Sequence, residues 1–187
     1  MKHCYPLFIL LLASTLFTVQ VKSQSSAEYK NTIQYQKIVT QIKDLIENIG
    51  SNLSAYKGDA IEKADAEDGA EYFAIKKPIL LSSDAYITHY KDGDTYKANF
   101  SFAKFDNNAD AGDFGKRLTE SLKKGVYSFG TLKSVTSGAE GLIELEVVLN
   151  KKATSKKFSN VHIFIKIPNK YGNSLENEVR VSISRWE

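Results

Sequence analysis

Cysteine is almost absent from this sequence, which has a single copy, Cys4, in 187 residues. Cys4 stands near the start of the chain, ahead of an apolar run and inside a segment that we predict to be removed. The rest of the chain then has no cysteine, which excludes disulfides, thiol nucleophiles and cysteine-ligated metal sites. We therefore expect the fold to be stabilised by packing alone.

Long hydrophobic runs are also lacking. The longest, Tyr5 to Phe17, falls short of the roughly 20 apolar residues that a membrane-spanning helix needs. Lys2 and His3 precede this run, and Val21-Lys22-Ser23 offers small or branched residues at the positions that signal peptidase reads. We predict that residues 1–23 are a removed export signal and that the protein is secreted or periplasmic. A retained membrane anchor is the alternative.

An excess of charge of one sign is the third absence. Two of the 25 Lys and Arg residues lie in the predicted signal, whereas all 22 Asp and Glu residues follow it, so the remaining chain carries a net charge of about +1. No basic stripe interrupts this balance, which argues against nucleic acid as a partner. Residues 24–187 are long enough for a single globular domain.

Apolar residues at three- and four-residue steps predict a long helix that begins at Ser25. Ser25 and Glu28 have the spacing of a capping box, and Gly50 is placed to end the helix. The apolar stripe consists of Tyr35, Ile38, Val39, Ile42, Leu45, Ile46 and Ile49. We expect this stripe to cover a sheet, and a coiled-coil contact with a partner helix is the alternative.

The segment after this helix is acidic, and we predict a solvated loop or short helix up to residue 71. Its spacing does not match a calcium-binding loop of the helix-loop-helix type. Tyr72 to Leu81 predicts a strand, which Lys77-Pro78 would place at a sheet edge. Ala85–Tyr90 and Thr95–Phe105 then flank an Asp-Gly turn and predict a hairpin.

A second, shorter helix follows the hairpin. We predict Asp110 as its N-cap and Gly125 as its end, with Phe114, Leu118 and Leu122 on its apolar side. A strand over Thr131 to Ser137 comes next. Its length suits one more member of the same sheet.

Three alternating segments predict neighbouring antiparallel strands at the end of the chain. Leu142–Asn150, Asn160–Pro168 and the stretch around Val179 to Ser184 each place apolar residues at every second position. Val148 is an apolar residue on the otherwise polar side. The apolar face of these strands requires a cover, which the helices supply.

The sequence therefore predicts an α+β fold: a curved antiparallel sheet of about six or seven strands, with a long N-terminal helix and a second shorter helix packed on one face. This order is similar to that of the cone-shaped ketosteroid-isomerase-like fold, in which a helix and a sheet enclose a pocket. The resemblance is one of architecture and rests on no motif residue. It implies no function by itself.

The polar face of the last three strands holds the candidate functional residues. Pairing of these strands would bring Glu146, His162 and Ser184 side by side, in the order of a hydrolytic relay. No oxyanion hole or nucleophile elbow accompanies them, so a solvated strand face is favoured and no catalytic residue is assigned. Exposed aromatics beside cations favour ligand binding instead. The predicted ligand-binding residues are Phe164, Trp186, His162 and Arg180.

No metal site or cofactor is expected, since two isolated histidines make a weak case for zinc. The sequence favours an exported, non-enzymatic domain that binds a small ligand or a protein partner. Two alternatives from other classes remain. One is a pocket-type isomerase or hydrolase, which would need polar groups converging in a concave site. The other is an envelope-structure or assembly subunit, which would show a large exposed apolar patch or an unpaired edge strand.

Overall fold

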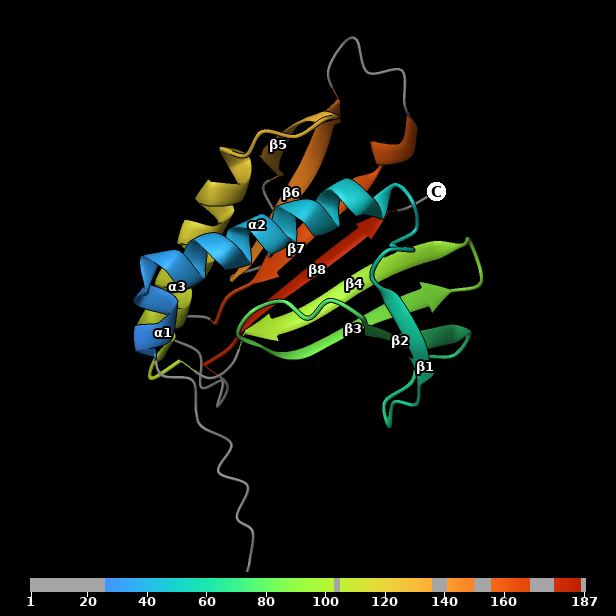
Figure 1. Cartoon of the computed structure of the whole chain (residues 1–187), viewed down its shortest axis with the longest axis horizontal. Coiled ribbons are helices and arrows are strands. Elements are labelled where there is room, and N and C mark those ends of the chain that lie inside the picture. Colours follow the sequence, from blue (N-terminus) through green and yellow to red (C-terminus); the bar gives the residue numbers. More distant parts are fainter. Residues whose placement is uncertain (1–25, 103–104, 136–140, 150–155, 169–176, 186–187) are drawn as a thin grey trace, which may run out of the picture.

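The protein is described by a computed structural model over residues 26–102, 105–135, 141–149, 156–168 and 177–185 (Figure 1). The predicted export signal and Trp186 lie outside these ranges. The helices are α1 (Ser26–Lys30), α2 (Thr32–Ile49) and α3 (Asn108–Lys123). The strands are β1 (Lys57–Ile61), β2 (Ala70–Ile75), β3 (Ser82–Tyr90), β4 (Thr95–Phe102), β5 (Gly130–Val135), β6 (Leu142–Leu149), β7 (Val161–Lys166) and β8 (Val179–Arg185). A 3-10 turn, Lys156–Phe158, precedes β7.

The first helical segment is divided at Asn31, so the prediction of one continuous helix from Ser25 is wrong. Asn31 has extended backbone (φ −65°, ψ 116°), and its side-chain oxygen accepts hydrogen bonds from the N–H groups of Ile33 and Gln34. This is the geometry of an N-cap, which starts α2 afresh after α1. The end of α2 at Gly50 and the burial of all seven stripe residues confirm the rest of the prediction.

All eight strands in the described part of the chain belong to one open antiparallel sheet. Their order is β1-β2-β3-β4-β8-β7-β6-β5. The last strand of the chain, β8, pairs with both β4 and β7 and thereby joins the β1–β4 meander to the β5–β7 meander (Figure 1). The α+β class and the antiparallel sheet are as predicted, and the number of strands is somewhat higher.

The additional strand is β1, which occupies a segment that we predicted as a loop or short helix. It pairs with β2, whose other neighbour is β3. The prediction that Lys77-Pro78 marks an edge strand is therefore wrong, because β2 ends at Ile75 and lies inside the sheet. The sequence of β1 is mostly polar and exposed, so it lacks the alternation that reveals the other strands.

The second helix, α3, begins three residues earlier than predicted. Its N-cap is Asn107, whose side chain accepts a hydrogen bond of 2.9 Å from the N–H of Asp110. Asp110 itself lies in the first turn and forms an ion pair of 3.1 Å with Lys30. A carboxylate in the first turn favours the helix dipole, so Asp110 still stabilises this end. The helix ends at Lys123, and its C-cap Lys124 is next to the predicted Gly125.

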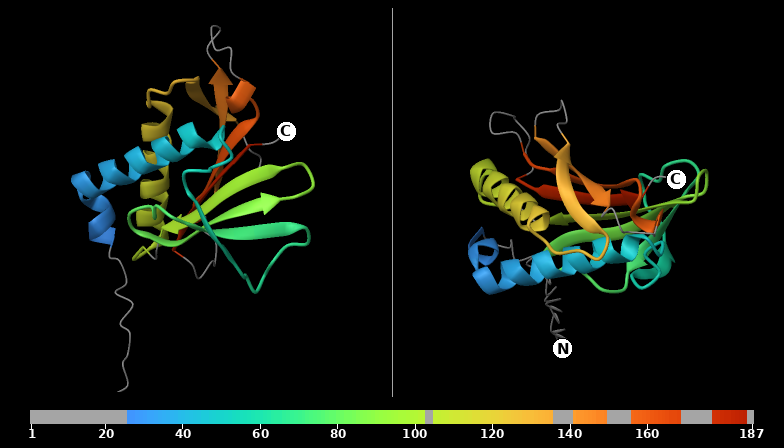
Figure 2. Two further views of the ribbon diagram at one scale, coloured as in Figure 1. Left: turned by 45° about the vertical axis from the view of Figure 1, so that its right-hand side comes forward. Right: turned by 90° about the horizontal axis from the view of Figure 1, so that it is seen from above.

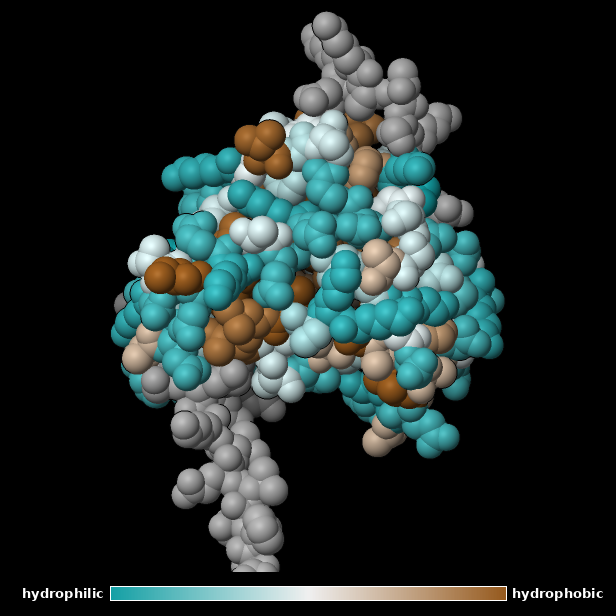
Figure 3. Space-filling view, viewed as in Figure 1, coloured by the Kyte–Doolittle hydropathy of each residue, from teal (hydrophilic) through white to brown (hydrophobic). Residues whose placement is uncertain are grey.

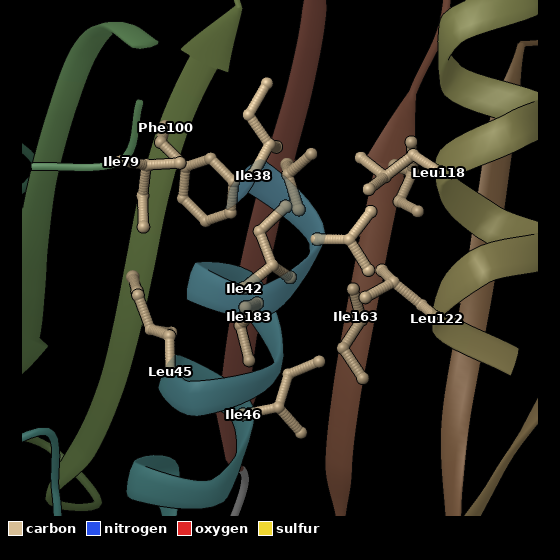
Figure 4. Packing of buried hydrophobic residues seen from close by; sticks show 14 of the residues in the cluster. Ile38, Ile42, Leu45, Ile46, Ile79, Phe100, Leu118, Leu122, Ile163 and Ile183 are labelled. Atoms are coloured by element: carbon tan, nitrogen blue, oxygen red, sulfur yellow. The ribbon is translucent and has the colours of Figure 1, made fainter. Parts of the chain in front are cut away.

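The core lies between the helices and one face of the curved sheet (Figure 2). Ile38, Ile42 and Ile46 of α2 point toward Phe100, Ile163 and Ile183 of the sheet, and Leu118 and Leu122 of α3 close the side (Figure 4). All of these side chains are buried. Each fully buried aliphatic side chain contributes about 1.5–3 kcal/mol, so α2 is held firmly on the sheet. The space between α2 and the strands is thus occupied by apolar side chains.

Candidate functional site

The face of the sheet turned away from α2, called the outer face here, carries a row of hydrogen-bonded polar side chains. Asn99 of β4 donates from Nδ2 to Thr88 Oγ1 of β3 at 3.1 Å. Ser182 of β8 donates from Oγ to Asn99 Oδ1 at 2.9 Å. Asn99 and Ser182 are directly opposed on β4 and β8, whereas Thr88 of β3 is a diagonal neighbour of Asn99, within reach of its amide.

A loop between β1 and β2, residues 62–69, folds over part of the outer face; we call it the acidic loop because four of its residues are Asp or Glu. Lys63 Nζ lies 3.5 Å from the centre of the Tyr86 ring and 3.6 Å from Asp84 Oδ2. At the other end of the loop, the Glu67 N–H donates to the Tyr72 hydroxyl at 2.8 Å. These contacts fix the loop against strands β2 and β3.

The hydroxyls of Tyr86 and Tyr90 on this face keep their protons at neutral pH. Burial raises the pKa of Tyr86. Burial also raises the pKa of Tyr90, and a hydrogen bond to the Glu67 carboxylate raises it further. Loss of the proton would place a second negative charge beside Glu67, which explains the direction of the shift. Tyr90 therefore holds Glu67 of the acidic loop at the sheet.

The acidic loop and the β3–β4 turn enclose a hollow of about 530 Å³ above strands β4 and β8, called the outer pocket here. Its charged and polar side chains come from the loop, the turn and the strands: Glu67, Asp68, Tyr90, Asp92, Thr95, Lys97 and Ser184. A second hollow of about 360 Å³ lies further along the same strands, lined in part by Lys63, Asp84, Asn99, Arg180 and Ser182. The outer face is therefore concave and polar at two places.

Ser184 is the more deeply buried of the two buried polar residues that line the outer pocket, the other being Thr95. Its side chain is 1% exposed, and its Oγ has no hydrogen-bond partner among the residues that the structure describes. Leaving a buried hydroxyl unpaired costs about 1–3 kcal/mol. Such a group in a folded protein calls for a bound water or ligand as its partner. The unpaired hydroxyl of Ser184 therefore makes the outer pocket a candidate ligand-binding site.

The register of the last strands brings Glu146, His162 and Ser184 side by side, with Glu146 opposite His162 and His162 opposite Ser184. The hydrogen bonds that these side chains form are not those of a Ser-His-acid relay. His162 Nδ1 contacts Glu144 Oε1 at 2.8 Å rather than Glu146, and in the described part of the chain Ser184 Oγ receives no bond from the imidazole. Diagonal neighbours on adjacent strands lie within reach of long side chains, which is why Glu144 competes with Glu146.

Three of the four predicted ligand-binding residues lie on the outer face, on β7 and β8. His162 and Phe164 are neighbours on β7 and stack with ring centres 6.1 Å apart. Arg180 lies on β8 at the second hollow, where its Nε is 3.2 Å from Glu178 Oε1. Trp186 is not among the described residues. Sequence reasoning named Ser184 for a relay and overlooked Lys97 and the acidic loop, although alternation along β4 already placed Lys97 on the polar side.

A separate charged cluster lies around His89, on the face of the sheet that carries the core. His89 Nε2 is 2.9 Å from Asp94 Oδ1, its Nδ1 is 3.3 Å from Glu71 Oε2, and its ring stacks on Tyr96. Lys91 Nζ lies 2.9 Å from Glu71 Oε1. The bond to Lys91, followed by that to His89, lowers the pKa of Glu71. These contacts tie together β2 and the β3–β4 turn.

Hydrophilic residues cover most of the surface on the side that α2 crosses (Figure 3). Two large apolar side chains are strongly exposed in the described ranges, Ile33 on α2 and Val126 after α3. Among the described helices, none has the length and apolar character required to cross a membrane. The described residues also contain no cluster of three or more His, Cys, Asp or Glu side chains suited to a metal ion.

Comparison with known proteins found no family model that matches the chain and no similar protein sequence or solved structure.

Proposed function

We propose that this protein is an exported, non-enzymatic domain, secreted or periplasmic, that binds a small polar ligand on the outer face of its sheet. The outer pocket supports this proposal most directly, because its volume of about 530 Å³ lies in the range typical of ligand sites. Ser184, buried there without a partner in the described structure, supplies a hydrogen-bonding group that a ligand would satisfy.

A protein partner is the second form of this proposal. Phe164 and Arg180 lie on the same face as the two hollows, and aromatic and arginine side chains are enriched in protein interfaces. The concave shape of the outer pocket nevertheless favours a small molecule over a flat protein surface.

The alternative functions find less support. An isomerase-like site would require a cavity between α2 and the sheet, where apolar side chains pack instead. A hydrolytic relay would require a bond between Ser184 and His162, and neither this bond nor one to Glu146 is formed in the described structure. An assembly role would use the edge strands β1 and β5, which have one neighbour each within the sheet, but both strands are short and carry an exposed charged side chain, Asp59 or Lys133, which disfavours pairing with another chain.

The test is an NMR titration of the ¹⁵N-labelled protein, expressed with its own residues 1–23. The mass of the recovered protein shows whether these residues are removed, as the export proposal expects. Glucose, inorganic phosphate and 5-aminopentanoate are added separately. We expect at least one of them to shift amide signals around the outer pocket, notably those of Gly93 and Lys97. Shifts confined to the groove beside α2, around Ile33 and Leu80, or no shifts at all, would contradict the proposal.

A further inference from the structure

We propose that the outer pocket recognises a zwitterion, a small molecule that carries both an ammonium and a carboxylate group. This inference rests on the proposed function, since it specifies the ligand of the same pocket. It follows from the way donors and acceptors are separated within the pocket. Donors stand on the strands, and acceptors stand on the loop and the turn.

The donors are Lys97 and Ser184, which are directly paired across β4 and β8. Side chains of directly opposed residues leave the sheet about 4.5–5.5 Å apart, so both can reach one carboxylate. The Lys97 ammonium forms no ion pair, and Ser184 Oγ no hydrogen bond, with any residue that the structure describes. An ammonium and a hydroxyl are both suitable donors for a carboxylate.

The acceptors are Asp68 of the acidic loop and Asp92 of the β3–β4 turn. Both are exposed, and both lack an ion pair within the described part of the chain. Glu67 adds a third carboxylate, which the Tyr90 hydroxyl holds in place. Ionised carboxylates only accept hydrogen bonds, so this side of the pocket suits an ammonium group.

The mixed charge disfavours simpler ligands. A pure anion that reaches Lys97 also meets the field of Asp68 and Asp92, whereas a pure cation meets that of Lys97. A neutral polyol avoids both repulsions but leaves Lys97, Asp68 and Asp92 without a counter-charge. A zwitterion places its carboxylate at the donors and its ammonium group at the acceptors, so both sides of the pocket gain a partner of opposite charge.

Ligand contact with Ser184 requires a small movement, because its Oγ is closed to solvent. Lys97 is directly beside Ser184 and has a long side chain without a fixed partner among the described residues. We infer that Lys97 turns toward the ligand carboxylate and thereby opens the hydroxyl. Lys97 then carries more of the affinity than Ser184.

Four probes with the same five-carbon chain separate the possibilities: 5-aminopentanoate, 1,5-pentanediamine, glutarate and 1,5-pentanediol. Their affinities are measured by the same NMR titration at low salt. We expect 5-aminopentanoate to bind about fivefold more tightly than the diamine or glutarate, since one favourable charge contact near 4 Å in water corresponds to about 1 kcal/mol. Glycine, 3-aminopropanoate and 6-aminohexanoate, tested alongside, establish the charge separation that fits best.

Charge-removing variants test the two ends separately. Lys97→Gln should weaken 5-aminopentanoate about fivefold and strengthen the diamine, whereas Asp92→Asn should also weaken 5-aminopentanoate but strengthen glutarate. Asp59→Asn removes an exposed carboxylate of β1 outside the pocket and is the matched control, with no change expected. Ser184→Ala should weaken 5-aminopentanoate about threefold without lowering the melting temperature, because it removes a buried hydroxyl that lacks a partner.

Two failures can be told apart. If the diol, glucose, the diamine or glutarate binds in the outer pocket as tightly as every zwitterion, the pocket is a binding site and the zwitterion inference is wrong. If neither these probes nor phosphate shifts amide signals around the outer pocket, both the proposed function and the zwitterion inference are wrong.

Discussion

At the scale of single residues, electrostatic partners on the sheet surface determine which groups are free for a ligand. His162 forms a hydrogen bond with Glu144, and Glu71 forms ion pairs with Lys91 and His89. Lys97 and Asp92 have no such partner within the described structure. The residues available to bind a ligand therefore differ from the ligand-binding residues predicted from the sequence.

Glu71 provides a pH test of these contacts. Its pKa lies below the usual 4.5, chiefly because of Lys91. A carboxyl with a lowered folded pKa stabilises the fold above the unfolded value and loses this contribution as pH falls through the folded value. Lys91→Gln should therefore raise the pKa of Glu71 toward 4.5 and reduce the acid sensitivity of the fold below that pH, as followed by ¹³C NMR titration. Lys133→Gln, on the opposite edge strand β5, should leave the pKa of Glu71 unchanged.

At the scale of elements, caps and close contacts determine where helices begin and how near they approach the sheet. Asn31 and Asn107 both act as N-caps through their side-chain oxygens. The sequence offered Asp110 as an equally suitable residue type in place of Asn107, and it gave no sign of the second start at Asn31. Local spacing does not choose between neighbouring caps, since the choice depends on where the helix packs.

Two glycines of α3 test how closely this helix packs. A Cβ at Gly112 meets no other atom, whereas a Cβ at Gly115 overlaps Cγ2 of Ile167. Gly112→Ala should stabilise the protein by about 0.5–1 kcal/mol, because alanine is the better helix former. Gly115→Ala should be less stable than Gly112→Ala by about 1–3 kcal/mol, owing to overpacking. Urea unfolding measures both, and equal stabilities would mean that α3 does not approach Ile167 closely.

At the scale of the whole molecule, the helices cover one face of the sheet and leave the other face to the acidic loop and solvent. This division places the hydrophobic core and the proposed binding site on opposite sides of the same strands. Ser182 and Ile183 illustrate it, because adjacent residues of β8 serve the outer face and the core respectively. Changes in the outer pocket should therefore leave the core intact.

The closed core makes a direct prediction for α2. Ile42 is completely buried, whereas Ile33 on the same helix is 70% exposed. Ile42→Ala should lower the free energy of unfolding by about 2–5 kcal/mol, and Ile33→Ala should change it by less than about 0.5 kcal/mol. Urea unfolding again provides the measurement. A small effect of Ile42→Ala would indicate that α2 stands away from the sheet.

The sequence by itself determined the faces of the elements. Alternation predicted the inward and outward residues of β6, β7 and β8, and the apolar stripe predicted the buried side of α2. The turn around Gly93 predicted the β3–β4 hairpin, where the glycine has φ 108°. These features are readable because helical and strand periodicities are local properties of the chain.

Only the tertiary structure decided which strands are partners and which polar residues are buried. Pairing of β8 with β4 joins segments about 80 residues apart, and many strands share the same alternation, so no local pattern specifies it. The mostly polar β1 became a strand through its pairing with β2. Ser184 lies in the outer pocket because β4 and the acidic loop are near it. These outcomes depend on the packing of distant segments, which periodicity does not encode.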